Sequence, residues 1–214
     1  EQKTRPYVVM EYFDGQTLAE LVAKQGPLAP EDWFEIAWCL ARALQTVHNR
    51  GVLHRSLRPG SVLLRREKNA EGLNCWRVKL LDTGLSLKRA VIHASASNPA
   101  AGVQTALGRS VARTIAYAPP EVVSRPKGQV WVGPHSDVYN FGRVCAFALM
   151  GRPDPDSADR VILDDAWGKL IDDCTAWTIG GRPPNFGPVL DRLAQVPGSN
   201  DRISRVESEL YDIA

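Results

Sequence analysis

The sequence predicts an α+β chain that is mainly α-helical and carries one small β-hairpin. Two long stretches, at residues 30–49 and 136–150, repeat their apolar residues at helical spacing. Between them, residues 62–65 and 76–81 have the apolar and β-branched composition of two strands. The polar stretch that separates these two runs suits a long turn, so we expect a hairpin packed among helices.

Size and charge set the first limits on function. The chain has 214 residues, is 44% hydrophobic and carries a net charge of +2. These values fit one domain with a sizeable core, and nothing in the overall charge points to nucleic acid or an anionic membrane. No apolar run approaches the roughly 18 residues that span a bilayer, and no secretory leader is evident. The sequence therefore predicts a cytoplasmic protein.

The cysteines predict no metal or redox site. They are widely separated, and no pair has C-x-x-C spacing. We expect reduced thiols that are buried or half-buried in the core. The four residues are Cys39, Cys75, Cys145 and Cys174.

The N-terminal part predicts a short strand and a capped helix. Residues 7–13 form a β-branched and aromatic run, and Asp14-Gly15 ends it with a turn signal. Thr17 is a suitable N-cap for a short helix over residues 18–23. Gly26-Pro27 then breaks the chain.

The next helix is predicted to face the core. Pro30 suits its first turn, and the acidic residues Glu31 and Asp32 favour its positive end. It is expected to end near Asn49-Arg50-Gly51, where the glycine provides the stop. The apolar residues of its core-facing stripe are Trp33, Ile36, Ala37, Leu40, Leu44 and Val47.

Helices also dominate the C-terminal half. Ser136 is expected to cap a helix that ends at Gly151, and further helices are predicted at about 164–177 and 187–195. From Pro197 to Asn200 the composition is that of a linker, and a last helix is expected to lead out of the domain. We therefore expect one domain over residues 1–196, followed by a linker and the start of a helical extension over 197–214.

Five short motifs follow one another along the chain. They are His54-Arg55-Ser56-Leu57-Arg58-Pro59-Gly60-Ser61, Leu81-Asp82-Thr83-Gly84, Thr114-Ile115-Ala116-Tyr117-Ala118-Pro119-Pro120-Glu121, Ser136-Asp137-Val138-Tyr139-Asn140-Phe141-Gly142 and Gly181-Arg182-Pro183-Pro184. In this order and at this spacing these motifs resemble the eukaryotic-type protein kinase family, over roughly residues 7–194.

The resemblance implies a kinase C-terminal lobe from the hinge onward. A kinase also has a Gly-rich loop, a strand lysine and a partner glutamate. The residues before Tyr7 cannot supply them, so the N-terminal lobe is expected to be absent from this chain. The start at Glu1 rather than Met suggests that the chain is a fragment of a longer protein.

By the same resemblance, several residues would form a nucleotide site. Met10 would be the gatekeeper, and Glu11 and Phe13 would offer backbone groups to an adenine ring. Leu63 would form the apolar floor beneath it. ATP and Mg²⁺ are expected only if an N-terminal lobe lies upstream.

The catalytic-type loop departs from the family pattern at three positions. Ser56 stands where the family has its base aspartate, and a hydroxyl is not basic near neutral pH. Ser61 stands where the metal-binding asparagine belongs, so it would hold a metal ion weakly. Arg58 replaces a lysine and keeps the positive charge. Asp82 is intact and could hold one Mg²⁺ through its carboxylate oxygens.

Three further positions have structural or regulatory roles in the family. Glu121 and Arg182 are expected to form a buried ion pair, and Asp137 is expected to hold the backbone of the catalytic-type loop. Arg55 could bind a phosphate placed on the activation segment, although the sequence favours a solvated loop without modification. The hydroxyls of that segment are Ser95, Ser97, Thr105, Ser110 and Thr114.

The substitutions favour a pseudokinase that acts as a regulatory or scaffolding module for protein partners or fused domains. The alternative is an active Ser/Thr protein kinase with an atypical catalytic loop, and Thr114 would then favour Ser/Thr over Tyr specificity. An unrelated binding domain is difficult to reconcile with five motifs in order. No nucleic-acid or membrane partner is indicated.

Overall fold

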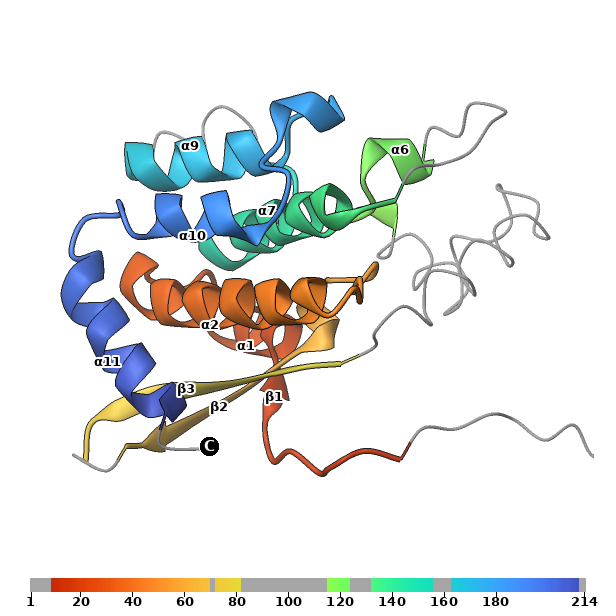
Figure 1. Cartoon of the computed structure of the whole chain (residues 1–214). Coiled ribbons are helices and arrows are strands. Elements are labelled where there is room, and N and C mark those ends of the chain that lie inside the picture. The colour runs from red at the N-terminus through yellow and green to blue at the C-terminus, as the bar shows by residue number, and fades with distance from the viewer. Residues whose placement is uncertain (1–8, 70–71, 82–114, 124–131, 156–162, 212–214) are drawn as a thin grey trace, which may run out of the picture.

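The computed structural model describes residues 9–69, 72–81, 115–123, 132–155 and 163–211, the last without the side chains of 208–211. A single three-stranded sheet lies at one edge of a stack of helices in this part of the chain (Figure 1). The elements are β1 (Gln16–Thr17), α1 (Leu18–Gln25), α2 (Pro30–Asn49), the 3-10 helix η1 (Pro59–Ser61), β2 (Val62–Lys68), β3 (Asn74–Leu80), α6 (Pro120–Val123), α7 (Pro134–Met150), α9 (Asp165–Cys174), the 3-10 helix η2 (Ile179–Gly181), α10 (Phe186–Leu193) and α11 (Ser199–Tyr211).

Helix α2 lies at the centre of the fold. In Figure 1 the hairpin lies below it, and α7, α9 and α10 are stacked above it. Pro30 occupies its first turn, with Glu31 and Asp32 at the positive end of the helix dipole, as predicted. Most of its apolar residues are fully buried in one hydrophobic core, which also includes residues of the hairpin and of α7, α9 and α10.

The sheet is antiparallel, with strand order β1-β2-β3. The predicted hairpin is confirmed, and its strands are longer than expected because β2 and β3 stay paired from Val62↔Leu80 to Lys68↔Asn74. The strand predicted over residues 7–13 is wrong for its described part, since residues 9–15 have no strand conformation. A β-branched run needs a hydrogen-bonding neighbour to form a strand, and β2 pairs only with Gln16 and Thr17 on this side.

Capping explains where the N-terminal helix begins and corrects the start of α7. The Thr17 hydroxyl accepts the Glu20 N–H at 3.1 Å, and the Glu20 carboxylate accepts the Thr17 N–H at 2.8 Å. This capping box confirms the predicted start of α1.

Helix α7 begins at Pro134, so Ser136 lies inside the first turn and is not the N-cap. Proline lacks an N–H and is well suited to the first helical position, so α7 begins at Pro134, before Ser136.

The last helix packs against the domain. Helix α11 contacts α2 and runs from beside it toward the hairpin (Figure 1), with Val206 buried in the common core. Arg42 Nε of α2 lies 3.9 Å from Glu207 Oε1, and Arg205 Nη1 lies 3.8 Å from Glu35 Oε1. The domain boundary at residue 196 stays a prediction.

The four cysteines are free thiols, three of them buried and Cys39 half-buried, as expected. Burial raises the pKa of Cys174 to about 12, so this thiol stays protonated and unreactive. Within the described ranges, none of the helices has the length and apolar character needed to cross a membrane.

Candidate functional site

Asp137 anchors the loop between α2 and β2. Its Oδ2 accepts the backbone N–H of His54 at 2.7 Å, and its Oδ1 accepts the backbone N–H of Arg55 at 2.6 Å. Oδ2 also lies 2.8 Å from Nε2 of His48, in the last turn of α2. The Asp137 side chain is only 1% exposed, so these charge-assisted hydrogen bonds are shielded from water. The predicted role of Asp137 is confirmed.

Arg55 has an unusual backbone conformation. Its φ is +63°, which places a non-glycine residue in the left-handed region. Such a residue costs on the order of 1–2 kcal/mol, and the hydrogen bond from its N–H to Asp137 offsets that cost. The turn leaves the Arg55 side chain exposed and directs the next residue, Ser56, into the interior.

Ser56 is buried without a visible hydrogen-bond partner. The residue is 4% exposed, and its Oγ makes no hydrogen bond to any residue that the structure describes. Both oxygens of the neighbouring Asp137 carboxylate already accept hydrogen bonds from the loop and from His48. Asp137 is therefore not available to act as a base in place of Ser56.

Ser61 closes the turn of the loop. Its hydroxyl donates to the Arg58 carbonyl at 2.8 Å and accepts the Arg58 N–H at 3.0 Å. A metal ion would have to compete with these local hydrogen bonds for the same oxygen. The role of Ser61 as a weak metal ligand and that of Arg58 at a phosphate stay predictions.

The residue that follows β3 is hydrogen-bonded to the loop between α2 and β2. Leu81 donates its N–H to the Ser61 carbonyl at 2.8 Å, and its own carbonyl lies 3.0 Å from His54 Nε2. The predicted metal ligand Asp82 is the next residue, but it lies outside the described residues. Among the described ones, His, Cys, Asp and Glu side chains do not gather in threes as they would around a metal ion.

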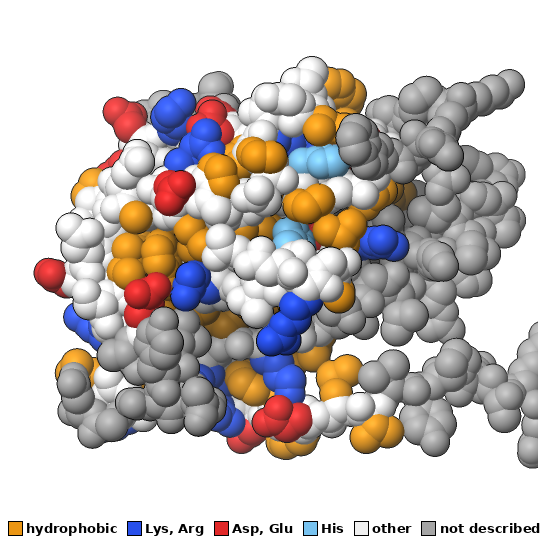
Figure 2. All heavy atoms as spheres, in the orientation of Figure 1, with side chains coloured by type: hydrophobic (Ala, Val, Ile, Leu, Met, Phe, Trp, Pro, Cys, Tyr) orange, Lys and Arg blue, Asp and Glu red, His pale blue; other side chains and the backbone are white. Residues whose placement is uncertain are grey.

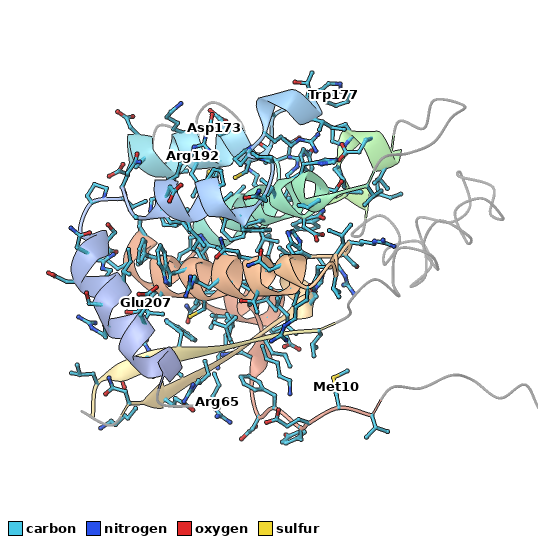
Figure 3. All side chains as sticks on the ribbon, in the orientation of Figure 1. Met10, Arg65, Asp173, Trp177, Arg192 and Glu207 are labelled. Atoms are coloured by element: carbon cyan, nitrogen blue, oxygen red, sulfur yellow. The ribbon has the colours of Figure 1, made fainter. Side chains whose placement is uncertain are left out.

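The predicted adenine-binding residues lie partly together. Lys79 of β3 donates from Nζ to the Glu11 carbonyl at 3.0 Å and lies 5.9 Å from the centre of the Phe13 ring. Leu63, opposite Lys79 in the sheet register, is half-buried beside it. Met10 is 53% exposed and lies on the N-terminal segment away from the hairpin (Figure 3). The structure thus brings Glu11, Phe13 and Leu63 to one face of the hairpin but leaves Met10 apart.

Glu121 and Arg182 form the predicted ion pair. Arg182 Nη1 donates to Glu121 Oε1 at 2.9 Å, and Nη2 donates to Oε2 at 3.0 Å, so the pair is bidentate. Burial would raise the pKa of the Glu121 carboxyl, but the hydrogen bonds from Arg182 and Ser136 outweigh burial and hold that pKa below its ordinary value. The carboxylate therefore stays charged at neutral pH.

The surroundings of Arg182 complete its hydrogen bonding. Its Nε donates to the Ala176 carbonyl at 2.6 Å, and Nη2 donates to the Trp177 carbonyl at 3.0 Å. The guanidinium also lies 4.7 Å from the centre of the Tyr139 ring. These contacts fix the segment before Arg182 against α6 and α7.

Sequence reasoning missed two residues of this arrangement. His48 could have been found, because a histidine in the last turn of a helix directly before the loop is a natural partner for a buried carboxylate. Tyr139 gave no such signal, since its contact with Arg182 joins residues far apart in the chain.

A buried aspartate holds a loop between a helix and a hairpin, and a Glu–Arg ion pair follows later in the chain. This combination defines the C-terminal lobe of a protein kinase. The family model of the protein kinase domain matches residues 1–164, and the chain belongs to this family.

Named relatives agree with this assignment. The chain is 34% identical over 148 residues to the serine/threonine-protein kinase PknB of Mycolicibacterium smegmatis, covering 69% of this chain and 20% of that protein. A probable serine/threonine-protein kinase PknB of Bifidobacterium longum is 31% identical, with 69% and 18% covered. The chain thus spans about a fifth of the length of these curated relatives. The PknI kinase domain of Mycobacterium tuberculosis has the same fold, with a TM-score of 0.59 at 21% identity over 87% of this chain and 64% of that one.

Proposed function

We propose that the chain is part of a pseudokinase, a kinase-fold module that regulates or scaffolds protein partners or fused domains with little or no phosphotransfer. The observation that carries this proposal is the buried Ser56 hydroxyl at the position of the base. The proposal includes a cytoplasmic location, in keeping with the composition of the chain.

The chemistry of phosphoryl transfer explains why this position matters. A protein kinase uses a carboxylate there to orient the acceptor hydroxyl and to take its proton. Ser56 offers a hydroxyl that is not basic near neutral pH, and Asp137 is already hydrogen-bonded to three donors. Loss of a general base typically lowers the rate by a factor of about 10²–10⁴.

Metal and nucleotide binding would be weakened rather than abolished. Protein kinases use ATP with Mg²⁺. In this chain Asp82 supplies a carboxylate suited to Mg²⁺, whereas the Ser61 hydroxyl is occupied by the Arg58 backbone. Nucleotide binding through Glu11, Phe13 and Leu63 would also require an N-terminal lobe contributed by a longer protein.

An active Ser/Thr protein kinase is the second candidate. It is supported by the curated relatives at 31–34% identity, which bear that name. The positive charge of Arg58 and the carboxylate of Asp82 are also retained in the sequence. In this case some other acid group would have to reach the acceptor hydroxyl.

Phosphotransfer from radiolabelled ATP by the full-length protein separates the two candidates. We expect the wild-type protein to transfer no more phosphate than its Asp82→Ala variant. We also expect a Ser56→Asp/Ser61→Asn variant, which restores the base and the amide, to gain transfer. The matched Ser56→Asn/Ser61→Asn variant restores the amide without a base and should gain none.

The active-kinase candidate predicts the opposite result for the unmodified protein. Wild-type transfer that disappears in Asp82→Ala would overturn the pseudokinase proposal. A thermal-shift measurement with ATP and Mg²⁺ on the same proteins reports nucleotide binding independently of transfer.

A further inference from the structure

One edge of the sheet is open beyond β1. Strand β1 pairs with β2 only at Gln16↔Leu64 and Thr17↔Leu63. From Arg65 to Lys68, β2 has β3 on one side and, within the described ranges, no strand on the other. Backbone N–H and C=O groups at such an edge can pair with an added strand.

A pocket of about 420 Å³ lies where β1 begins. Its floor is apolar and is formed by the buried side chains of Leu21 from α1, Leu64 from β2 and Trp76 from β3. Gly15 brings the chain close to β2 here, since a Cβ on this residue would lie 2.6 Å from the Leu64 carbonyl oxygen. The pocket has room for an apolar side chain from a segment lying along the open edge.

The rim of the pocket is polar and cationic. Gln16, Gln25, Arg65 and Arg66 complete its lining. Arg65 and Arg66 are consecutive in β2, so their side chains point to opposite faces of the sheet. Arg66 is held in place over Trp76, with its guanidinium carbon 5.1 Å from the ring centre and Nη2 donating to Asp32 Oδ1 at 3.1 Å. No Asp or Glu is among the residues that line the pocket.

The hairpin concentrates positive charge well beyond the average of the chain. Strands β2 and β3 carry five cations and one carboxylate, and Asp32 and Glu11 pair with Arg66 and Lys79, so the hairpin with these partners carries a net charge of +2, equal to that of the whole chain. Figure 2 shows Lys and Arg side chains over the region of the hairpin, and Figure 3 shows Arg65 projecting from it. The charged residues are Arg65, Arg66, Lys68, Arg77, Lys79 and Glu67.

We propose that the open edge of β2 and this pocket bind an extended acidic segment of a partner protein, which adds a strand beside Arg65–Lys68. Neighbouring side chains of such a strand point to opposite faces of the sheet, so an apolar residue would enter the pocket while its acidic neighbours lie on the face of Arg65. A nucleic acid could pair with the positive charges, but it has no peptide N–H and C=O groups to hydrogen-bond with the open edge of β2. The proposal holds whether or not the protein transfers phosphate.

Fluorescence anisotropy on the full-length protein tests this with two labelled nine-residue peptides. One alternates Glu with Val, and the other alternates Lys with Val. We expect only the acidic peptide to bind, and the Arg65→Glu variant to weaken its binding by about tenfold or more. The control Lys169→Glu reverses another exposed, ion-paired cation, on α9, and should change the affinity by less than about twofold.

Hydrogen exchange identifies the mode of binding. The acidic peptide should slow exchange of the amides within Arg65–Lys68, because an added strand protects them. The proposal is overturned if the acidic peptide does not bind up to about 1 mM, or if both peptides bind equally. It is also overturned if Lys169→Glu is as damaging as Arg65→Glu, or if the edge amides gain no protection. An oligonucleotide that binds with the same dependence on Arg65 and without edge protection would assign the surface to nucleic acid instead.

Discussion

The Asp137 carboxylate accepts the backbone N–H of Arg55 at 2.6 Å and so holds this residue at a φ of +63°. One oxygen of a helix residue thereby fixes the conformation of a loop more than eighty residues earlier. The same carboxylate binds His54 and His48, so the loop, the end of α2 and the start of α7 meet at a single side chain.

Replacing Asp137 with Asn should therefore be strongly destabilising. The amide would present a donor to groups that are themselves donors, and it would lack the charge that strengthens these bonds. We expect the free energy of unfolding to fall by about 3–5 kcal/mol, measured by urea denaturation followed through tryptophan fluorescence. The control is Asp191→Asn on the exposed face of α10, which should change stability by less than about 0.5 kcal/mol. Equal effects of the two substitutions would contradict the anchoring role of Asp137.

The Arg182–Glu121 pair predicts strong coupling in a double-mutant cycle. Arg182→Ala leaves the Glu121 carboxylate partly buried without its bidentate partner and also removes the bonds to the Ala176 and Trp177 carbonyls. We expect a loss of about 3–5 kcal/mol. The same substitution in a Glu121→Gln background should cost clearly less, and additive costs would show that the two side chains do not interact.

Acid should remove the contribution of Glu121. Its pKa is held below its ordinary value in the folded protein, so its stabilising effect is present above about pH 4.5 and is lost as pH falls through the folded pKa. The difference in unfolding free energy between the wild type and Glu121→Gln should be constant from about pH 7 to pH 6 and shrink toward pH 3. A difference that grows on acidification would refute the direction of the shift.

Gly142 and Gly168 should respond to alanine with opposite signs. A Cβ on Gly142 of α7 would lie 2.7 Å from the Cys174 Cβ, whereas a Cβ on Gly168 of α9 would meet nothing within 4 Å. We expect Gly142→Ala to destabilise by about 1–3 kcal/mol through overpacking. Gly168→Ala should stabilise by about 0.5–1 kcal/mol, because alanine is the better helix former. Thermal melts of the two variants check both signs, and stabilisation by both would show that α7 and α9 are not closely packed here.

Local signals predicted much of the fold. Pro30 with its acidic neighbours marked the start of α2, Thr17 marked the cap of α1, and Gly151 marked the end of α7. The N-cap of α7 was placed three residues late, at Ser136 instead of Gly133, because Ser136 has the chemistry of a cap but its hydroxyl bonds to Glu121 instead.

Side-chain contacts between residues distant in the sequence were harder to predict than the helices and strands. The resemblance to kinases led to Asp137 and to the Glu121–Arg182 pair, since a family motif encodes contacts between distant residues. The stacking of Arg66 on Trp76 and the hydrogen bond from Lys79 to Glu11 carry no local periodicity or motif. Such contacts depend on the three-dimensional arrangement of strands and could be recognised only in the structure.

Helix α2 links the C-terminal helix to the loop at residues 54 and 55. Its Glu35 and Arg42 lie beside α11, and His48 in its last turn is hydrogen-bonded to Asp137, which holds the backbone of the loop. We therefore expect a change in the position of α11 to alter the conformation of this loop through α2.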